Sequence, residues 1–187
     1  MDNVFSILTD NPVIAAVKDE QQLDLAAKSD CGAVFLLFGS ILNIAALVGK
    51  VKAAGKLAFV HIDLVEGLSG KEVAVTAIKE LAAPDGIIST RPALLRHAKS
   101  LGLITVQRFF VVDSLSVRNI LPQSRAVKPD FIEIMPGLLP RVISDITQST
   151  EIPVIAGGLI SEKEHIISAL SSGASAVSTS RPELWEA

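Results

Sequence analysis

The stretch FVHIDLVEGLSG, residues 59–70, places a histidine and a carboxylate, His61 and Asp63, at the end of an apolar run. A charged group is seldom buried without a partner. A ligand hydroxyl, or a neighbouring ammonium such as that of Lys18, would be such a partner. An internal ion pair or a hydrogen-bonded latch without any ligand is the alternative, both here and at Glu133 further along the chain. These residues are the first candidates for a small-ligand site.

A sharper signal lies towards the carboxyl end of the chain. The segment PVIAGGLIS joins an apolar run to a helix signal through Gly157 and Gly158, and AVSTS ends on Thr179 and Ser180. Glycine lets a phosphate group approach the backbone closely, and the N-terminus of a helix presents free N–H groups to an anion. We therefore predict a phosphate site formed by these two segments together, which a lone Gly-Gly pair would not justify.

Other reactive side chains give weaker signals. His61, Asp63 and Glu133 offer the donor atoms of a metal site, but no tight ligand spacing accompanies them, and we expect no metal. No G-x-S-x-G pattern appears, so no catalytic residue is assigned. The single cysteine, Cys31, is expected to be a buried small hydrophobe. His97 and His165 fall on predicted helices and are expected at the surface.

The elements that must position these residues follow a regular rhythm. Short β-branched runs alternate with longer segments of helical period. The strands are expected over residues 13–17, 33–38, 57–63, 86–90, 103–109, 131–136, 153–158 and 176–180. The helices are expected over residues 20–29, 41–54, 70–82, 92–101, 114–127, 138–148, 162–172 and, more weakly, 182–186.

Helix boundaries carry their own signals. Two helix starts fit a capping box, in which side chain and backbone amide satisfy each other: Ser69-x-x-Glu72 and Ser161-x-x-Glu164. Pro92 suits a first helical turn because its missing N–H would be unpaired there. Glycines stand where helices should stop, at Gly55, Gly102 and Gly173.

Eight strand signals, each followed by a helix signal, indicate a parallel sheet in one domain over residues 1–187. An open doubly wound sheet and a closed eight-stranded (β/α)8 TIM barrel both fit, and the count of eight favours the barrel. In a barrel the strand ends converge on one mouth, with phosphate sites frequently after strands seven and eight. The candidates at these ends are Lys18, His61, Asp63, Ser89, Thr90, Arg91, Gln107, Arg108, Glu133, Gly157, Gly158, Ser178, Thr179 and Ser180.

Charge is unevenly spread along the chain. The net charge is −3, but residues 91–128 carry seven basic residues against the single acid Asp113, so this segment is +6 and the remainder is −9. Such asymmetry indicates a polyanionic partner, although an ordinary solvated helical face gives the same count. No apolar run approaches the ~18 residues of a membrane helix, and the acidic start is a poor signal peptide. We expect a cytoplasmic protein with no membrane partner.

Several stretches together resemble a known family. HIDLVEG (61–67), ISTR (88–91), VQRFFVVDS (106–114), KPDFIEIMPG (128–137), IPVIAGG (152–158) and AVSTS…LW (176–185) are similar, in order and along nearly the whole chain, to the glycerol uptake operon antiterminators. The resemblance implies a barrel fold, glycerol 3-phosphate as an effector with no further cofactor, and binding to a leader mRNA. It also implies a regulator of glycerol genes and not an enzyme.

The resemblance carries ligand contacts onto matching positions. These are His61 and Asp63, the Ser89-Thr90-Arg91 element, Gln107 with Arg108, Glu133, the glycines Gly157 and Gly158, and the pair Thr179 and Ser180. Lys18 departs from the pattern, because related sequences carry arginine there and only arginine offers a bidentate fork. RNA contact is expected from the basic segment: Arg91, Arg96, Lys99, Arg108, Arg118, Arg125 and Lys128.

A second function stays open at this point. The same residues would suit an isomerase or lyase acting on a small phosphorylated metabolite, with Asp63 or Glu133 as general base and His61 as its partner. The fold alone does not decide between an enzyme and a regulator. A homodimer is also possible, and the sequence does not say how an effector would be coupled to RNA.

Overall fold

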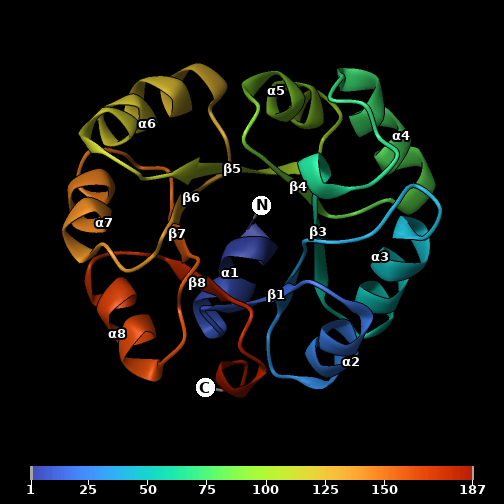
Figure 1. Cartoon of the computed structure of the whole chain (residues 1–187), viewed down its shortest axis with the longest axis horizontal. Helices are drawn as coiled ribbons and strands as arrows, with labels where there is room; N and C mark the ends of the chain where they lie inside the picture. Colours follow the sequence, from blue (N-terminus) through green and yellow to red (C-terminus); the bar gives the residue numbers. More distant parts are fainter. Residues whose placement is uncertain (1, 187) are drawn as a thin grey trace.

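The computed structural model describes residues 2–186, in which eight parallel strands form one closed barrel. The strands follow one another in chain order, and β1 (Val13–Val17) pairs with β8 (Ala176–Thr179) to close the ring, as Figure 1 shows. The predicted TIM barrel is confirmed, and the pairing of first and last strands excludes the open doubly wound sheet. Among residues 2–186 no helix has the length and apolar character required to cross a membrane.

The remaining elements complete an eightfold alternation. The other strands are β2 (Ala33–Leu36), β3 (Leu57–His61), β4 (Gly86–Ser89), β5 (Ile104–Phe110), β6 (Phe131–Met135) and β7 (Val154–Gly157). The helices are α1 (Asp2–Asp10), α2 (Glu20–Lys28), α3 (Ile44–Ala53), α4 (Glu72–Ala82), α5 (Pro92–Ser100), α6 (Ser114–Val127), α7 (Pro140–Thr147) and α8 (Lys163–Ser171). Two 3₁₀ turns follow strands: η1 (Ile62–Leu64) and η2 (Pro182–Leu184).

Helix α1 has no counterpart among the predicted elements. Val4 and Leu8, one helical turn apart, are buried against the residues that fill the base of the barrel. The contact is close, because a Cβ added at Gly32, just before β2, would lie 2.3 Å from the side chain of Ile7. Figure 1 shows α1 in the centre of the ring. The helix therefore closes the end of the barrel from which the strands start.

The predicted capping boxes are wrong at both helix starts. Helix α4 begins after Lys71 and helix α8 after Glu162, and neither has a side-chain cap. Ser69 lies two residues and Ser161 one residue before the N-cap position, because the backbone is still extended at Lys71 and Glu162. The reciprocal box forms instead at α6, where Asp113 accepts from the amide of Ser116.

The other predicted helix boundaries, marked by proline and glycine, are confirmed. Pro92 is the first residue of α5, and a glycine follows directly after the C-cap residue of three helices. These glycines have positive φ, the left-handed conformation that glycine adopts without strain: Gly55, Gly102 and Gly173. Each reverses the chain into the next strand.

Side chains alternate between the barrel lumen and the helical layer, because successive residues of a strand point to opposite faces. The base of the lumen is apolar, and Phe35 and Phe59 meet there edge to face with ring centroids 5.4 Å apart. Two residues further along each strand the lumen becomes polar. These upper positions include Lys18, His61, Arg108, Glu133 and Ser178. The fold thus collects polar groups at the mouth and hydrophobic packing beneath them.

Candidate ligand site at the barrel mouth

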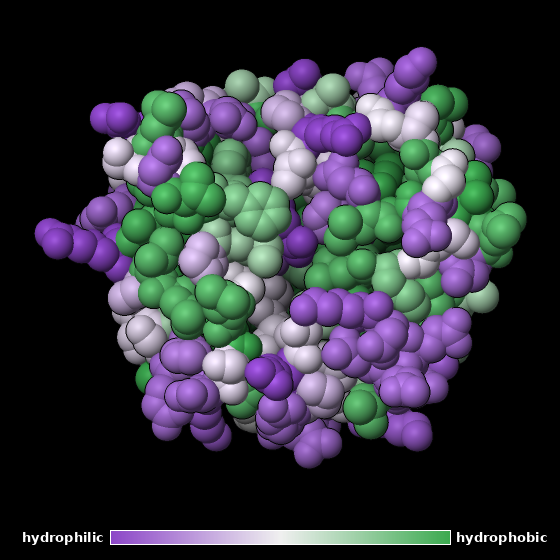
Figure 2. Space-filling view, in the orientation of Figure 1, coloured by the Kyte–Doolittle hydropathy of each residue, from purple (hydrophilic) through white to green (hydrophobic). Residues whose placement is uncertain are grey.

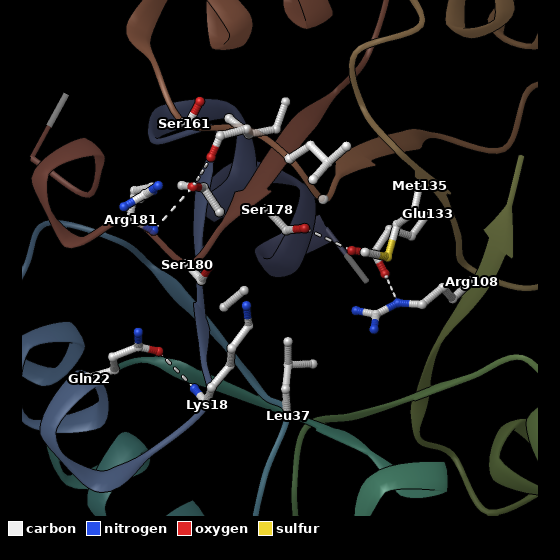
Figure 3. Close-up of a pocket in the computed structure, with 15 residues that line it drawn as sticks. Lys18, Gln22, Leu37, Arg108, Glu133, Met135, Ser161, Ser178, Ser180 and Arg181 are labelled. Atoms are coloured by element: carbon white, nitrogen blue, oxygen red, sulfur yellow. Dashed lines mark hydrogen bonds and ion pairs between the residues drawn. The ribbon is translucent and has the colours of Figure 1, made fainter.

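A cavity of about 540 Å³ opens at the carboxyl ends of the strands. Its walls come mainly from β1, β5, β6 and the loops that follow β7 and β8 (Figure 3). The lining residues are Ala16, Lys18, Gln22, Leu37, Arg108, Glu133, Met135, Gly158, Leu159, Ile160, Ser161, Ser178, Thr179, Ser180 and Arg181. The size lies within the range of small-molecule sites, about 300–1,000 Å³.

The charges around this cavity are mostly positive. Lys18, Arg108 and Arg181 line it, and Glu133 is the one carboxylate among the lining residues. Within residues 2–186 neither Lys18 nor Arg181 has a salt-bridge partner. A wall with two unpaired cations attracts a small anion.

A buried ion pair forms part of the cavity floor. The Nε of Arg108 donates to Glu133 Oε2 at 2.6 Å, and Ser178 Oγ donates to Glu133 Oε1 at 2.7 Å. Glu133 is fully buried and Arg108 nearly so. Each carboxylate oxygen therefore has a donor, and the guanidinium end of Arg108 extends beyond its Nε into the lumen (Figure 3).

The two glycines at the end of β7, Gly157 within the strand and Gly158 just after it, are required by close neighbours. A Cβ at Gly157 would lie 2.5 Å from both Glu133 Oε1 and Ser178 Oγ, and Gly158 adopts a positive φ of 72° against the side chain of Met135. Any larger residue at the first position would displace the buried carboxylate. The glycines thus let the β7 loop lie directly beside the cavity floor.

The two loops predicted to hold a phosphate lie side by side. Gly157 and Ser178 are register partners in neighbouring strands, and Thr179 Oγ1 donates to the carbonyl of Ile160 at 2.8 Å. Trp185 is buried and its Nε1 donates to the carbonyl of Thr179 at 2.9 Å. The hydroxyl of Thr179 is therefore engaged within the protein, and it fixes the β7 and β8 loops to each other.

Some of the amides in these loops are already used. The amide of Ser161 donates to His165 Nδ1 at 3.3 Å, and that of Arg181 donates to Thr179 Oγ1 at 3.2 Å. His165, expected at the surface, is partly buried by this contact. An anion between the loops would rely on the remaining backbone groups and on the side chains of Lys18, Ser180 and Arg181.

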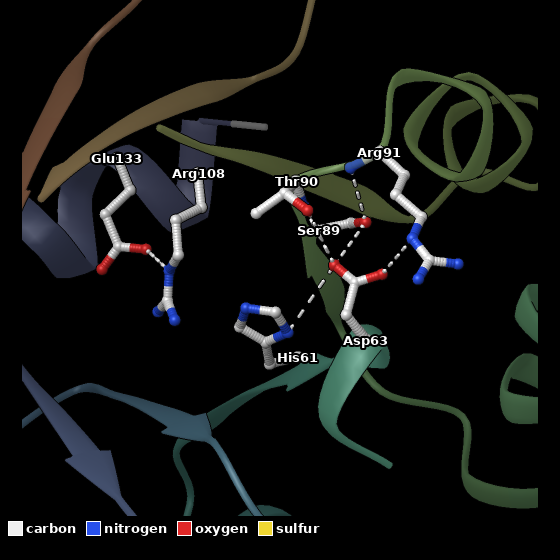
Figure 4. A network of polar contacts seen from close by, with 7 residues as sticks. All are labelled: His61, Asp63, Ser89, Thr90, Arg91, Arg108 and Glu133. Atoms are coloured by element: carbon white, nitrogen blue, oxygen red, sulfur yellow. Dashed lines mark hydrogen bonds and ion pairs between the residues drawn. The ribbon is translucent and has the colours of Figure 1, made fainter. Parts of the chain in front are cut away.

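A second polar cluster occupies the opposite side of the mouth, above β3 and β4 (Figure 4). Asp63 Oδ2 accepts from Ser89 Oγ at 2.8 Å and from the amide of Thr90 at 3.0 Å, while Arg91 Nε lies 3.4 Å from Asp63 Oδ1. Asp63 stands in the turn η1 and not in the strand, so the strand predicted over residues 57–63 is too long at this end. The strand ends at His61, and the turn redirects the carboxylate towards β4.

His61 lies between the two clusters. It is 4% exposed, and its Nδ1 is 3.9 Å from Asp63 Oδ2 without a hydrogen bond. Burial, helped by the nearby positive charge of Arg108, lowers the pKa of His61 from 6.5 to about 4, while Asp63 opposes the shift. The imidazole is therefore neutral at pH 7.

The structure separates the predicted ligand residues into groups. Lys18, Glu133, Gly158, Thr179 and Ser180 line the cavity, and Gly157 lies directly behind it. Asp63, Ser89 and Arg91 belong to the cluster above β3 and β4, His61 lies next to it, and all four are outside the cavity lining. Gln22, Ser161 and Arg181 are lining residues that were missed, because they stand two to five residues beyond the strand ends.

Gln107 lies apart from both groups. It pairs in register with Ile132 on the sheet face that packs against the helices, whereas its neighbour Arg108 faces the lumen. The side chain is fully buried, and neither its Oε1 nor its Nε2 has a hydrogen-bond partner. The period of two along β5 accounts for this placement.

The predicted RNA contacts divide in a similar way. Arg108 is buried in its ion pair, so the expectation that it reaches RNA is wrong. Arg91 is exposed beside the mouth but pairs with Asp63. The other five are exposed on α5, on α6 or just after α6: Arg96, Lys99, Arg118, Arg125 and Lys128. Lys99 Nζ donates to the carbonyl of Lys128, which holds the ends of the two helices together.

The other candidate side chains, Cys31 and His97, make contacts within the protein. Cys31 is buried, its Sγ is 3.5 Å from the carbonyl of Trp185, and burial raises its pKa to about 11. His97 is partly buried against Thr76 Oγ1 at 2.8 Å. Within the described part of the chain, no group of three or more His, Cys, Asp or Glu side chains is arranged to hold a metal ion.

Comparison with known proteins now adds to this geometry. Residues 13–185 match the family described as glycerol-3-phosphate responsive antiterminator. The chain belongs to this family. A solved member is the glycerol uptake operon antiterminator regulatory protein of Listeria monocytogenes, 35% identical, with a TM-score of 0.91 and coverage of 95% of this chain and 96% of that one. The predicted resemblance is thereby confirmed.

Further relatives support the assignment to this family. An antiterminator-related protein of Thermotoga maritima is 35% identical, with a TM-score of 0.84 and coverage of 94% of this chain and 98% of that one. Protein YgcP of Escherichia coli, which is uncharacterised, is 44% identical over 96% of this chain and 94% of its own length. A deoxyribose phosphate aldolase of Aeropyrum pernix, 16% identical with a TM-score of 0.71, shares the fold alone.

Proposed function

We propose that this chain is a regulator that binds glycerol 3-phosphate in the mouth cavity and, in response, binds the leader mRNA of glycerol-utilisation genes. The observation that carries the proposal is the cavity wall, where Lys18 and Arg181 are unpaired cations and Glu133 is already neutralised by Arg108. A small phosphate ester with hydroxyl groups complements such a wall, because it offers one anion and several neutral polar atoms.

The charges of the cavity wall support one orientation of the ligand. Its phosphate would lie between the β7 and β8 loops, within reach of Lys18, Ser180 and Arg181. Its hydroxyl groups would lie deeper, against Glu133, Ser178 and the guanidinium of Arg108. A buried carboxylate accepts hydrogen bonds from hydroxyls and repels a second anion, so it orients the ester with the phosphate outward.

The RNA surface would be the outer face of α5 and α6. Arg118 and Arg125 stand seven residues apart and therefore share one side of α6, and Arg96 and Lys99 continue the charge onto the neighbouring helix α5. Their contacts would be mainly with phosphates, so the affinity should fall steeply as salt increases, with a slope of about −0.7 per phosphate for a single strand.

The test is a filter-binding assay of the full chain with leader RNA, with and without glycerol 3-phosphate, over a series of salt concentrations. We expect the effector to tighten binding. Arg118→Glu should weaken RNA binding and reduce the salt slope, while Lys28→Glu on α2, a matched charge reversal away from that surface, should do so much less. An RNA affinity that the effector leaves unchanged at every salt concentration contradicts the proposal.

The enzyme alternative receives no specific support. Both carboxylates named as general bases are engaged, Asp63 by Ser89, Thr90 and Arg91 and Glu133 by Arg108 and Ser178. Incubation of the protein with glycerol, triose and pentose phosphates, followed by NMR, checks this directly. Turnover that disappears in Glu133→Gln would favour the enzyme over the regulator.

A further inference from the structure

Large apolar side chains are exposed mainly around the barrel mouth. Among the residues with described side chains, eleven large hydrophobics are exposed, and eight of them lie at the carboxyl ends of the strands, in the loops that follow or at the start of the next helix. Apart from Val73 at the start of α4, these form what we call the apolar rim: Ile41, Leu42, Leu64, Phe110, Val112, Leu115 and Leu159. Leu42 is 93% exposed and Val112 is 83% exposed. The four outside the rim are scattered singly over α2, α4 and α8, which is ordinary for a protein surface.

The rim has two lobes on either side of the cavity. In the first lobe, the loops after β5, β6 and β7 are tied by bonds from the amide of Val111 to Met135 and from the amide of Gly137 to Gly157. In the second, the loops after β2 and β3 are joined by a bridge between Ser40 and Glu66. Figure 2 shows hydrophobic side chains on both sides of the central hollow.

Three of the five loops that form these lobes carry no charge: the segments 37–43, 136–139 and 158–161 contain no Asp, Glu, Lys or Arg. The loops after β3 and β5 carry Asp63, Glu66, Lys71 and Asp113. Depletion of charge at the centre of a surface patch is the compositional mark of a protein–protein interface. A nucleic acid is a poor occupant, because its phosphates require basic residues and these three loops offer none.

We propose that the apolar rim is the interface of a homodimer in which two copies meet mouth to mouth. A two-fold interface must be self-complementary, and two apolar lobes flanking one cavity satisfy this when the first lobe of each copy packs on the second lobe of the other. Seven side chains exposed to this degree present apolar area on the order of several hundred Å², which is comparable to the largest patch of a typical monomer, and such a patch is often functional. A stable dimer needs about 800 Å² per partner, and the polar atoms between the lobes would contribute the remainder.

This pairing determines where each ligand surface lies. The two cavities would face each other across the interface, and the basic surfaces of α5 and α6, on the outer wall of each barrel, would remain free. If the proposed function holds, an effector in the cavity can leave only when the copies separate. The dimer itself does not depend on that function, because it rests on the rim alone.

The experiment is sedimentation velocity of the full chain over the micromolar range, with and without glycerol 3-phosphate. Leu42→Asp and Val112→Asp each place a charge in the interface without touching the cavity lining. Ile167→Asp on α8, itself 56% exposed, is the matched control. We expect a dimer for the natural chain and the control, and a dissociation constant raised at least about tenfold in either rim variant. Circular dichroism establishes that each variant folds.

Three results would overturn the dimer. In the first, the natural chain stays monomeric at every concentration. In the second, the natural chain dimerises and both rim variants dimerise equally well. In the third, the natural chain is monomeric and the rim variants lose affinity for leader RNA, so the rim is an RNA-binding surface. Calorimetry with glycerol 3-phosphate is run on the same samples. A dimer that fails to bind the ester leaves the interface intact and contradicts the proposed function, so the two failures are distinguishable.

Discussion

The two sides of the barrel mouth contain similar residues but use them differently. Above β3 and β4, Asp63 Oδ2 accepts from Ser89 and Thr90, and its Oδ1 lies beside Arg91 without a hydrogen bond, so the cluster connects two strand ends. On the opposite side both oxygens of Glu133 accept hydrogen bonds, while the side chains of Lys18 and Arg181 face a cavity and have no salt-bridge partner within residues 2–186. A basic residue at a strand end is thus the stronger candidate to hold an anion when its side chain has no ion-pair partner.

The largest expected effect comes from the buried ion pair. Glu133→Ala would leave Arg108 as an uncompensated buried charge, which costs about 3–5 kcal/mol of unfolding free energy. Asp63→Ala, in the more exposed cluster above β3 and β4, should cost about 1–2 kcal/mol. Urea unfolding followed by the fluorescence of the buried Trp185 measures both. Equal losses would mean that the two sides of the mouth do not differ in burial as described.

His61 should make the free energy of unfolding depend on pH. Its folded pKa is about 4 and its unfolded pKa is about 6.5, so the unfolded chain binds the proton first as pH falls. The stability is fully present above about pH 6.5 and decreases by about 3 kcal/mol as the pH falls to about 4. We expect His61→Gln to remove this part of the slope. An unchanged slope in the variant would assign the titration to other groups.

Effector affinity tests the two sides directly. Lys18→Met should weaken the binding of glycerol 3-phosphate by about 10–100-fold, because a hydrogen bond to a charged group is lost. Asp63→Asn should leave the affinity within about twofold, since its partners are all internal. Isothermal calorimetry at constant ionic strength measures both constants. A comparable loss of affinity in the two variants would mean that the cluster around Asp63 also contacts the ligand.

The smallest effect concerns Gln107, which belongs to neither side. Gln107→Leu removes two buried polar atoms that lack partners, and it should stabilise the fold by about 1 kcal/mol without changing effector affinity. Thr105→Val is the control on the same face of β5, where the hydroxyl donates to Asp130 at 2.7 Å and its loss should destabilise. Weaker effector binding by Gln107→Leu would show that the amide reaches the ligand.

Much of the fold could be predicted from the sequence, because parallel strands buried on both faces read as short apolar runs and the glycines after the helices mark the returns. The positions of Gly157 and Thr179 in neighbouring loops also followed from their place after the seventh and eighth strands. Helix α1 could not be predicted, since its burial of Val4 and Leu8 depends on the closed base of the barrel and not on a local signal.

Which polar residues of the mouth face the cavity also could not be predicted from the sequence. Asp63 and Lys18 both follow strand ends, but only the turn η1 decides that the carboxylate meets β4 instead of the cavity. Arg108 and Gln107 are adjacent in the sequence and lie on opposite faces of β5, and choosing between them requires knowing which face is the lumen. The missed Arg181 lies beyond the last strand, where no periodic pattern points to the cavity.

Helix α1 has one further consequence. By closing the base, it leaves only the mouth open, so a molecule bound in the lumen must leave through the end by which it entered. Groups that cover the mouth can then slow the dissociation of the molecule without changing its equilibrium affinity. Measurements of the dissociation rate will therefore detect such groups more directly than equilibrium titration.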